Sequence, residues 1–210
     1  ALAPAALYRA EKSCSYCHKR GRINRACIEG ETVMKLGTAI AEIMKREGIE
    51  ILCGYPVNHL IEYAAAADIR PVMVRQERIG VHMADAISRV TSGQSIGAFC
   101  MQHGPGAENA MGGVAQCYGE SVPVLVLPMG YARRLANIDQ NFNSSQAMKA
   151  FSKSSEPINI AAEVCNIFRR AFTKLKNGRG GPVIVEIPAD MWNEDVPEPL
   201  RPHVAAGVQR

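Results

Sequence analysis

The sequence predicts an α/β domain: a doubly wound, mostly parallel sheet of about five to six strands with helices on both faces. Two observations predict this class. Short apolar runs alternate along the chain with longer stretches whose apolar residues recur at helical spacing. The apolar runs are also continuous, which is typical of parallel strands that are covered on both sides.

The predicted elements follow one another in a regular order. A helix over 31–48 ends at Gly48, and a helix over 77–93 ends at Gly93, because glycine readily adopts the left-handed conformation that closes a helix. The second of these helices carries four apolar residues on one face, namely Ile79, Met83, Ile87 and Val90. Other helices are expected over 57–68, 104–120 and 158–178. Strands are expected over 49–56, 70–74, 95–102, 122–129 and 181–188, with a polar loop over 131–146.

Composition limits the function classes. The chain has 210 residues, of which 47% are hydrophobic and 21% charged, as in ordinary globular domains. The net charge is only +4 and the basic residues are scattered, so we expect no nucleic-acid partner. No apolar run approaches the roughly 18 residues of a membrane span, so we expect no membrane partner. Four cysteines lie in apolar, periodic segments and are predicted core residues, which fits a cytoplasmic, reducing location: Cys53, Cys100, Cys117 and Cys165.

Residues 1–30 differ from the rest because they show no clear periodicity. The run "CSYCH" at 14–18 has the spacing of a haem-attachment motif. Four residues of this segment could also be offered as zinc ligands, namely Cys14, Cys17, His18 and Cys27, although their spacing matches no standard module. We interpret 1–30 as an N-terminal extension that contributes nothing to the site.

Functional residues are expected where strands meet helices, because sites of doubly wound folds lie at the carboxyl ends of the strands. The junction "QHGPGAEN" at 102–109 has two glycines at a helix start, where backbone can approach a ligand closely. It is neither a dinucleotide fingerprint nor a phosphate-binding P-loop. The other junctions are "GYPVN" at 54–58, "RQER" at 75–78 and "PMGYA" at 128–132.

Glu77 has two possible roles. A glutamate in the first turn of a helix is favoured by the helix dipole, and Arg75 or Arg78 could pair with it. It could equally be a carboxylate held where chemistry needs it. The sequence shows no Ser-His-Asp set, paired-carboxylate site or closed metal cluster, so composition and periodicity indicate only a small-molecule α/β domain.

Four ordered motifs carry a family resemblance: "GIEILCGYPVNHLIE", "VMVRQERIGVHMADAISRVTSG", "QHGPGAENAMGGVAQCYGESVPVLVLPM" and "GRGGPVIVEIPADM". Together they make the run from Leu36 to Asp190 resemble the N-terminal, pyrimidine-binding domain of thiamine-diphosphate enzymes of the acetolactate synthase type. The resemblance favours this superfamily over an unrelated flavodoxin-like nucleotide-binding domain.

The resemblance implies a cofactor, a substrate class and a set of site residues. The cofactor would be thiamine diphosphate and the substrate a small 2-oxo acid, which is decarboxylated or joined to a second molecule. The glutamate that matches Glu77 hydrogen-bonds N1′ of the cofactor's aminopyrimidine in this family and promotes removal of the C2 proton, so Glu77 is the implied catalytic residue. The implied cofactor-binding residues are Pro56 and Val57 on the pyrimidine side, and His103, Gly104, Pro105 and Asn109 on the next wall.

The sequence departs from the family pattern at four places, one of which is the run "AISR" at 86–89, where the family has "GYAR". Val57 stands where the family usually has glycine, and His103 where it usually has serine or threonine. The run "IDQNFNSSQ" is only a loose echo of the family's Phe-Gln-Glu loop, so neither Gln140 nor Gln146 is assigned to the site. These departures leave the identity of the 2-oxo acid open.

The family's magnesium signature, "GDG" followed by an asparagine, is not in this sequence. We therefore expect the chain to be incomplete and inactive alone, with Mg²⁺ and the diphosphate-binding domain supplied by another domain or subunit and no metal ligands here. On this interpretation, residues 31–195 form the pyrimidine-binding domain and 196–210 begin a linker. A homo-oligomer is expected, because apolar positions such as Ala64 to Ala67 lack cover. The alternatives are the α-type subunit of a split 2-oxo acid decarboxylase of the sulfopyruvate or phosphonopyruvate type, and a catalytically silent assembly module.

Overall fold

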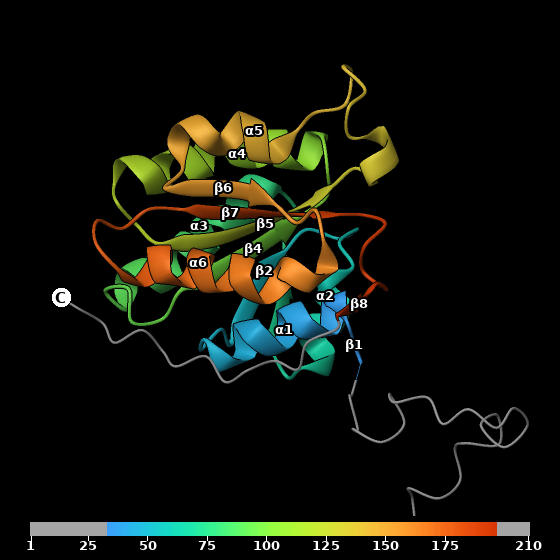
Figure 1. The fold of residues 1–210 in the computed structure, drawn as a ribbon. Helices are drawn as coiled ribbons and strands as arrows, with labels where there is room; N and C mark the ends of the chain where they lie inside the picture. The colour runs from blue at the N-terminus through green and yellow to red at the C-terminus, as the bar shows by residue number, and fades with distance from the viewer. Residues whose placement is uncertain (1–32, 197–210) are drawn as a thin grey trace, which may run out of the picture. The chain divides into compact units, whose positions relative to one another are not determined.

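The computed structural model describes residues 33–196, which form a six-stranded parallel sheet with helices on both faces (Figure 1). The predicted fold class is therefore confirmed. The strand order is β3-β2-β4-β5-β7-β6, and every neighbouring pair is parallel. The strands are β2 Ile51–Gly54, β3 Arg70–Met73, β4 Gly97–Met101, β5 Val124–Gly130, β6 Ser154–Pro157 and β7 Val183–Pro188.

The helices form two layers, one on each face of the sheet (Figure 1). The first layer contains α1 Leu36–Arg46, α2 Leu60–Ala66 and α6 Val164–Lys176. The second contains α3 Glu77–Val90, α4 Pro105–Gly119, the short α5 Ser144–Ala147 and the 3-10 turn Met148–Phe151. A two-residue ribbon, β1 Met34–Lys35 with β8 Asp195–Val196, joins the two ends of the described part in antiparallel fashion.

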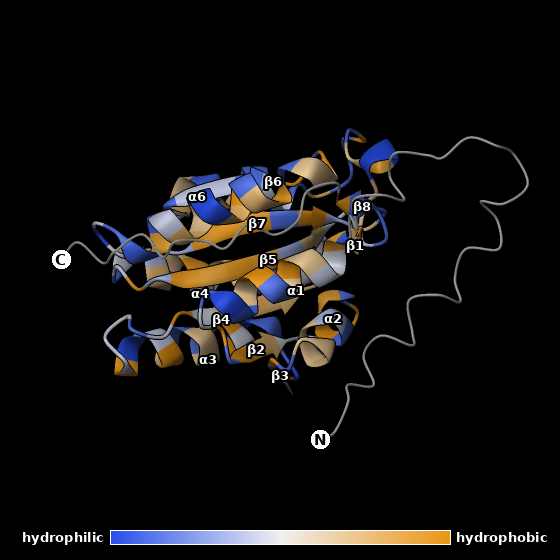
Figure 2. Ribbon diagram, turned by 60° about the horizontal axis from the view of Figure 1, so that its bottom comes forward, coloured by the Kyte–Doolittle hydropathy of each residue, from blue (hydrophilic) through white to orange (hydrophobic). Residues whose placement is uncertain are grey.

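The central strands are buried on both faces, as their continuous apolar sequences predict. Along β5, Leu125 packs in the layer of α1 and α6, whereas Val126 packs in the layer of α3 and α4. Because successive side chains of a strand point to opposite faces, a strand between two helical layers needs an apolar residue at every position. Figure 2 shows β5 and β7 as apolar bands between the helical layers.

The cysteine prediction is confirmed for three residues. Cys53, Cys100 and Cys117 are buried, whereas Cys165 is only partly buried. Burial raises the pKa of the Cys53 thiol to about 11, so this thiol is uncharged at neutral pH.

Two predicted helix ends are confirmed. Gly48 has φ +90° after α1, the left-handed conformation that closes a helix, and after α3 both Ser92 (φ +51°) and Gly93 (φ +75°) are left-handed. Two predicted starts are too early: α1 begins at Leu36 rather than 31, and α6 at Val164 rather than 158. A 3-10 turn at Ala161–Glu163 precedes α6.

The predicted apolar face of α3 is covered only in its middle. Met83 and Ile87 are partly buried and pack against the core, whereas Ile79 is 47% exposed and Val90 is 80% exposed. The closest approach to the sheet is made by smaller residues: a Cβ added at Gly80 would lie 2.2 Å from the Phe99 ring of β4. The apolar side chains at the two ends of this face are thus uncovered. Of the predicted uncovered run Ala64 to Ala67, Ala64 is buried, which corrects that prediction in part.

The sixth strand was not predicted. β6 has the polar sequence Ser-Ser-Glu-Pro, lies at the edge of the sheet and pairs only with β7. The predicted polar loop before it contains the 3-10 turn Arg133–Leu135 and the start of α5. No helix within 33–196 is long and apolar enough to cross a membrane. The predicted extension 1–30, with its candidate haem and zinc ligands, and the predicted linker beyond Val196 lie outside the described residues.

Candidate functional site

The predicted junctions meet at one edge of the sheet. Because all six strands are parallel, the loops after β2, β3, β4 and β5 leave the same side. The chain passes from β2 outward to β3 and then back across to β4, so the order of the strands reverses between β2 and β4. A reversal of this kind is where open α/β sheets bind ligands.

Glu77 lies at this edge as the first residue of α3. Its side chain is buried, with the residue only 4% exposed, and Oε2 accepts a hydrogen bond of 3.2 Å from Nδ2 of Asn109 in α4. Arg75 and Arg78 are exposed, and neither forms an ion pair with Glu77 among the described residues. The interpretation of Glu77 as a solvated or arginine-paired helix start is therefore wrong.

Gly106 allows the Glu77 carboxylate to lie against α4. A Cβ added at Gly106 would lie 3.2 Å from Oε1 of Glu77 and 2.6 Å from Cγ of Gln102. Glu77 and Gln102 therefore flank the same glycine. Sequence reasoning missed Gln102, although its place in the quoted junction between β4 and α4 was a usable signal.

His103 and Tyr131 come from neighbouring strands and pack against each other. His103 follows β4 and Tyr131 follows β5, and their ring centroids are 4.3 Å apart at an interplanar angle of 56°. Gly104 lies under the phenol: it has φ +59°, and a Cβ added there would be 3.0 Å from the Tyr131 hydroxyl. Nδ1 of His103 is buried and has no hydrogen-bond partner within 33–196. Tyr131 was not predicted as a site residue.

The loop after β2 is anchored by Asn58. Its buried side-chain amide donates to the carbonyl oxygens of Met101 (2.8 Å), the last residue of β4, and of Leu127 (3.3 Å), in the middle of β5, and its Oδ1 accepts from the Leu60 amide (3.0 Å). The residue before it, Val57, has φ +72° and is 66% exposed. Left-handed backbone is costly for a β-branched residue.

The structure thus joins two of the predicted site residues directly, Glu77 and Asn109. Pro105 is the first residue of α4 and is exposed, as is Pro56. The roles predicted for Pro56, Val57, His103, Gly104 and Pro105 in cofactor binding remain predictions. Within the described part of the chain, no group of three or more His, Cys, Asp or Glu residues could hold a metal ion.

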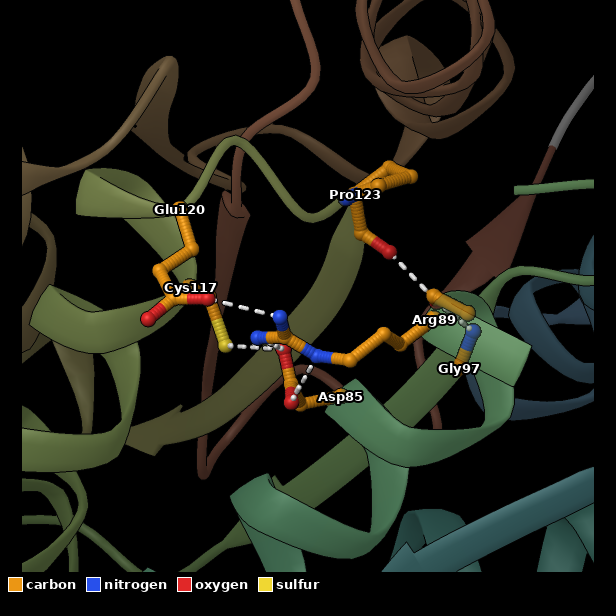
Figure 3. Close-up of polar contacts among 7 residues, drawn as sticks. Asp85, Arg89, Gly97, Cys117, Glu120 and Pro123 are labelled. Atoms are coloured by element: carbon orange, nitrogen blue, oxygen red, sulfur yellow. Dashed lines mark hydrogen bonds and ion pairs between the residues drawn. The ribbon is translucent and has the colours of Figure 1, made fainter. Parts of the chain in front are cut away.

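A second buried carboxylate on α3, Asp85, has a different environment (Figure 3). Arg89 donates to it twice, from Nε and from an Nη, each at 3.1 Å, and also reaches Glu120 on α4 at 2.6 Å. The Cys117 thiol lies 3.6 Å from Asp85 Oδ1. This cluster fixes the carboxyl-terminal half of α3 to α4.

Glu186 of β7 is a third buried carboxylate. Oε2 accepts a hydrogen bond of 2.6 Å from the Ser145 amide of α5. Gly130 of β5 makes room for this carboxylate, because a Cβ added there would lie 2.6 Å from Oε1 of Glu186. Burial raises the pKa of Glu186, and hydrogen bonds from Ser145 act in the opposite direction.

Comparison with known protein families decides the relationship. Residues 34–153 match the family "Thiamine pyrophosphate enzyme, N-terminal TPP binding domain". The chain belongs to this family. All the predicted site residues lie within the matched segment, which runs from α1 through α5.

Among curated proteins, the chain is similar to acetolactate synthase large subunits. It is 31% identical to isozyme 3 of Escherichia coli K12 over 153 residues, which are 70% of this chain and 26% of that protein. It is 30% identical to the Haemophilus influenzae protein over 166 residues, 76% of this chain and 29% of that protein. A probable acetolactate synthase large subunit of Methanocaldococcus jannaschii is 30% identical over 168 residues, 78% of this chain and 28% of that protein. The chain thus spans little more than a quarter of these relatives.

Proposed function

We propose that this chain supplies the pyrimidine-binding half of a thiamine-diphosphate enzyme that decarboxylates or carboligates a 2-oxo acid. The observation that carries the proposal is Glu77, a buried carboxylate at the switch point whose only hydrogen bond within 33–196 comes from a neutral amide. A carboxylate buried without a cationic partner weakens folding, so a ligand that hydrogen-bonds it would account for its presence.

The residues at this edge fit the cofactor's aminopyrimidine. When bound, thiamine diphosphate supplies the carbon that adds to the carbonyl of a 2-oxo acid. Glu77 would share a proton with the ring nitrogen N1′, and Asn109 would hold the Glu77 carboxylate in place. Gly104 and Gly106 present backbone without side chains, so a flat ring could come close.

The diphosphate and Mg²⁺ would be held by another domain or subunit. The relatives are several times longer than the matched segment, and the described residues include no metal-ligating group. The uncovered face of α3, with Ile79 and Val90, begins two residues beyond Glu77 and is the surface on which we place that partner. A partner there would also exclude water from Glu77.

Two other functions remain as candidates. The chain could be the α-type subunit of a split 2-oxo acid decarboxylase, with the same chemistry divided between two polypeptides. It could also be a silent assembly module, which the departures at Val57 and His103 would favour. The burial of Glu77 favours a catalytic role over assembly, because burying a carboxylate without a cationic partner costs folding free energy and adds nothing to an interaction surface.

The test is Glu77→Gln in the complete enzyme, with the diphosphate-binding part present. Glutamine keeps the size of the side chain but cannot share the proton with N1′ in the same way. Exchange of the cofactor's C2 proton into deuterated water, followed by NMR after acid quench, should slow by at least about 100-fold. The cofactor should still bind, because the diphosphate is held elsewhere.

The matched control is Glu108→Gln, which makes the same change in the first turn of the neighbouring helix α4, at an exposed glutamate. It should leave the exchange rate unchanged. Exchange in Glu77→Gln as fast as in the unmodified enzyme would refute the catalytic role of Glu77. Turnover without added thiamine diphosphate would refute the cofactor assignment.

A further inference from the structure

The His103 imidazole has one nitrogen buried and the other open. Nδ1 is buried and unpartnered, as described above. Nε2 also makes no hydrogen bond within 33–196. Unlike Nδ1, it is not buried, so it is accessible to solvent. The two nitrogens of this ring therefore lie in different environments.

Tyr131 is the aromatic residue that packs against this imidazole. Its ring lies 4.3 Å from the imidazole, and its hydroxyl lies over Gly104, the residue after His103. The positive φ of Gly104 and its lack of a Cβ leave room for the phenol. Tilted aromatic pairs at this separation are favourable, so the pair holds the imidazole in one orientation.

We infer that Tyr131 is a positioning residue that directs Nε2 of His103 toward the ligand bound at the carboxyl edge of the sheet. This inference rests on the proposed function, and it assigns to His103 a hydrogen bond to the 2-oxo acid substrate through Nε2. An imidazole can donate or accept at this nitrogen, whereas the serine or threonine hydroxyl usual at this position in the family is smaller and cannot ionise near neutral pH.

The geometry makes the phenol ring, and not its hydroxyl, the important part of Tyr131. The hydroxyl makes no hydrogen bond within 33–196, whereas the ring is in contact with the imidazole. Tyr131→Phe keeps the ring and should preserve the orientation of His103. Tyr131→Leu removes the ring and should free the imidazole to rotate.

The first measurement needs only the full chain. NMR of ¹⁵N-labelled histidine reports whether the two imidazole nitrogens have distinct shifts, as when one tautomer dominates, or averaged shifts, as when both nitrogens reach water and the two tautomers interconvert by proton exchange. The chain has five histidines, and the signal missing from His103→Gln identifies His103. We expect distinct shifts in the unmodified chain and in Tyr131→Phe, and averaged shifts in Tyr131→Leu.

The control for this measurement is Tyr118→Leu, the same substitution at an exposed tyrosine near the far end of α4. It should leave the His103 signals unchanged. Averaged shifts in the unmodified chain, or distinct shifts that persist in Tyr131→Leu, would overturn the positioning role.

The second measurement uses the complete enzyme with pyruvate, 2-oxobutanoate and phenylpyruvate as probes. His103→Gln and Tyr131→Leu should each lower kcat/KM about tenfold, the worth of one hydrogen bond. The double variant should lose no more than either single one, because both changes remove the same interaction. Tyr131→Phe should retain kcat/KM.

The two measurements test different parts of the inference. Losses that add in the double variant, or an unchanged kcat/KM in His103→Gln, would overturn the substrate contact. If the unmodified enzyme shows no thiamine-dependent turnover of any probe, the proposed function fails together with the substrate contact. The NMR result still decides whether Tyr131 positions His103.

Discussion

Two buried carboxylates on helix α3 differ in what surrounds them. Asp85, in the middle of the helix, is bound by the Arg89 guanidinium through two hydrogen bonds and contacts the Cys117 thiol. Glu77, at the start of the same helix, is equally buried but accepts one hydrogen bond from the Asn109 amide. Both side chains are carboxylates, but among the described residues only Asp85 has a cationic partner, Arg89.

The contrast extends beyond these two residues. Around Asp85, every charged group has an opposite charge within hydrogen-bonding distance (Figure 3). Around Glu77, the same edge of the sheet carries an unpartnered His103 nitrogen and a left-handed Val57. Proteins depart from local optimality mainly where function requires it, so this contrast supports the proposal that the amino-terminal end of α3 carries the site.

The largest expected effect on stability comes from Asp85→Asn. It removes the charge that binds Arg89, so Tm should fall by roughly 5 °C. Glu77→Gln should leave Tm unchanged or raise it, because it removes a buried charge that has no cationic partner. Thermal unfolding followed by circular dichroism measures both. Equal losses in the two variants would show that Glu77, like Asp85, has a structural role.

A smaller effect is expected from Val57→Asn. Asparagine adopts left-handed backbone more easily than valine, and an exposed side chain gives up little burial, so the free energy of unfolding should rise by about 1 kcal/mol. The control, Val90→Asn, makes the same change at an exposed helical position and should alter stability by only a few tenths of a kcal/mol. Denaturant titration distinguishes them. A loss of stability in Val57→Asn would mean that the valine side chain is needed for folding.

The smallest effect concerns Glu186, which is intermediate between the two carboxylates of α3. Its pKa is raised by burial, so the folded chain binds the proton more tightly than the unfolded chain. The contribution of Glu186 to stability should therefore be fully present below the ordinary pKa of 4.5 and be lost as the pH rises through the raised value in the folded state. Glu186→Gln, which can still accept the Ser145 hydrogen bond, should flatten this dependence and raise stability at neutral pH. Titration of Tm against pH in both proteins checks the sign.

Much of the fold could be predicted because its strands carry their own signal. The run Val124 to Leu127 is apolar at every position, which only a strand between two layers requires. β6 has no apolar run that would predict a strand: its sequence is Ser-Ser-Glu-Pro, and it is extended because it pairs with β7. The core-facing side of α3 was predicted only in part: Met83 and Ile87 pack against the core, but the closest approach to the sheet is made by small residues such as Gly80, which carry no hydrophobic signal.

The candidate site could be predicted only as separate junctions. The sequence placed Glu77 at a strand end, but its burial and its bond to Asn109 depend on how α3 packs against α4. Tyr131 could not be assigned, because its contact with His103 joins two segments whose proximity depends on strand order. Asn58 was quoted within a turn motif, and nothing local indicates that it reaches the carbonyl oxygens of β4 and β5.

The edge strand β3 limits how copies of this chain can aggregate. The amide of Arg70 bonds inward to the Glu50 carbonyl and that of Val74 to Gly54, so the alternate residues Pro71 and Met73 direct their backbone nitrogens outward. Pro71 has no N–H, which leaves Met73 as the single outward donor of β3. A foreign strand would therefore find two outward carbonyl acceptors but only one outward donor on β3, which disfavours continuous pairing along this edge. At the opposite edge, β6 carries a Glu156 that is paired with Arg170. A proline in one edge strand and a charged residue in the other thus disfavour amyloid-like stacking.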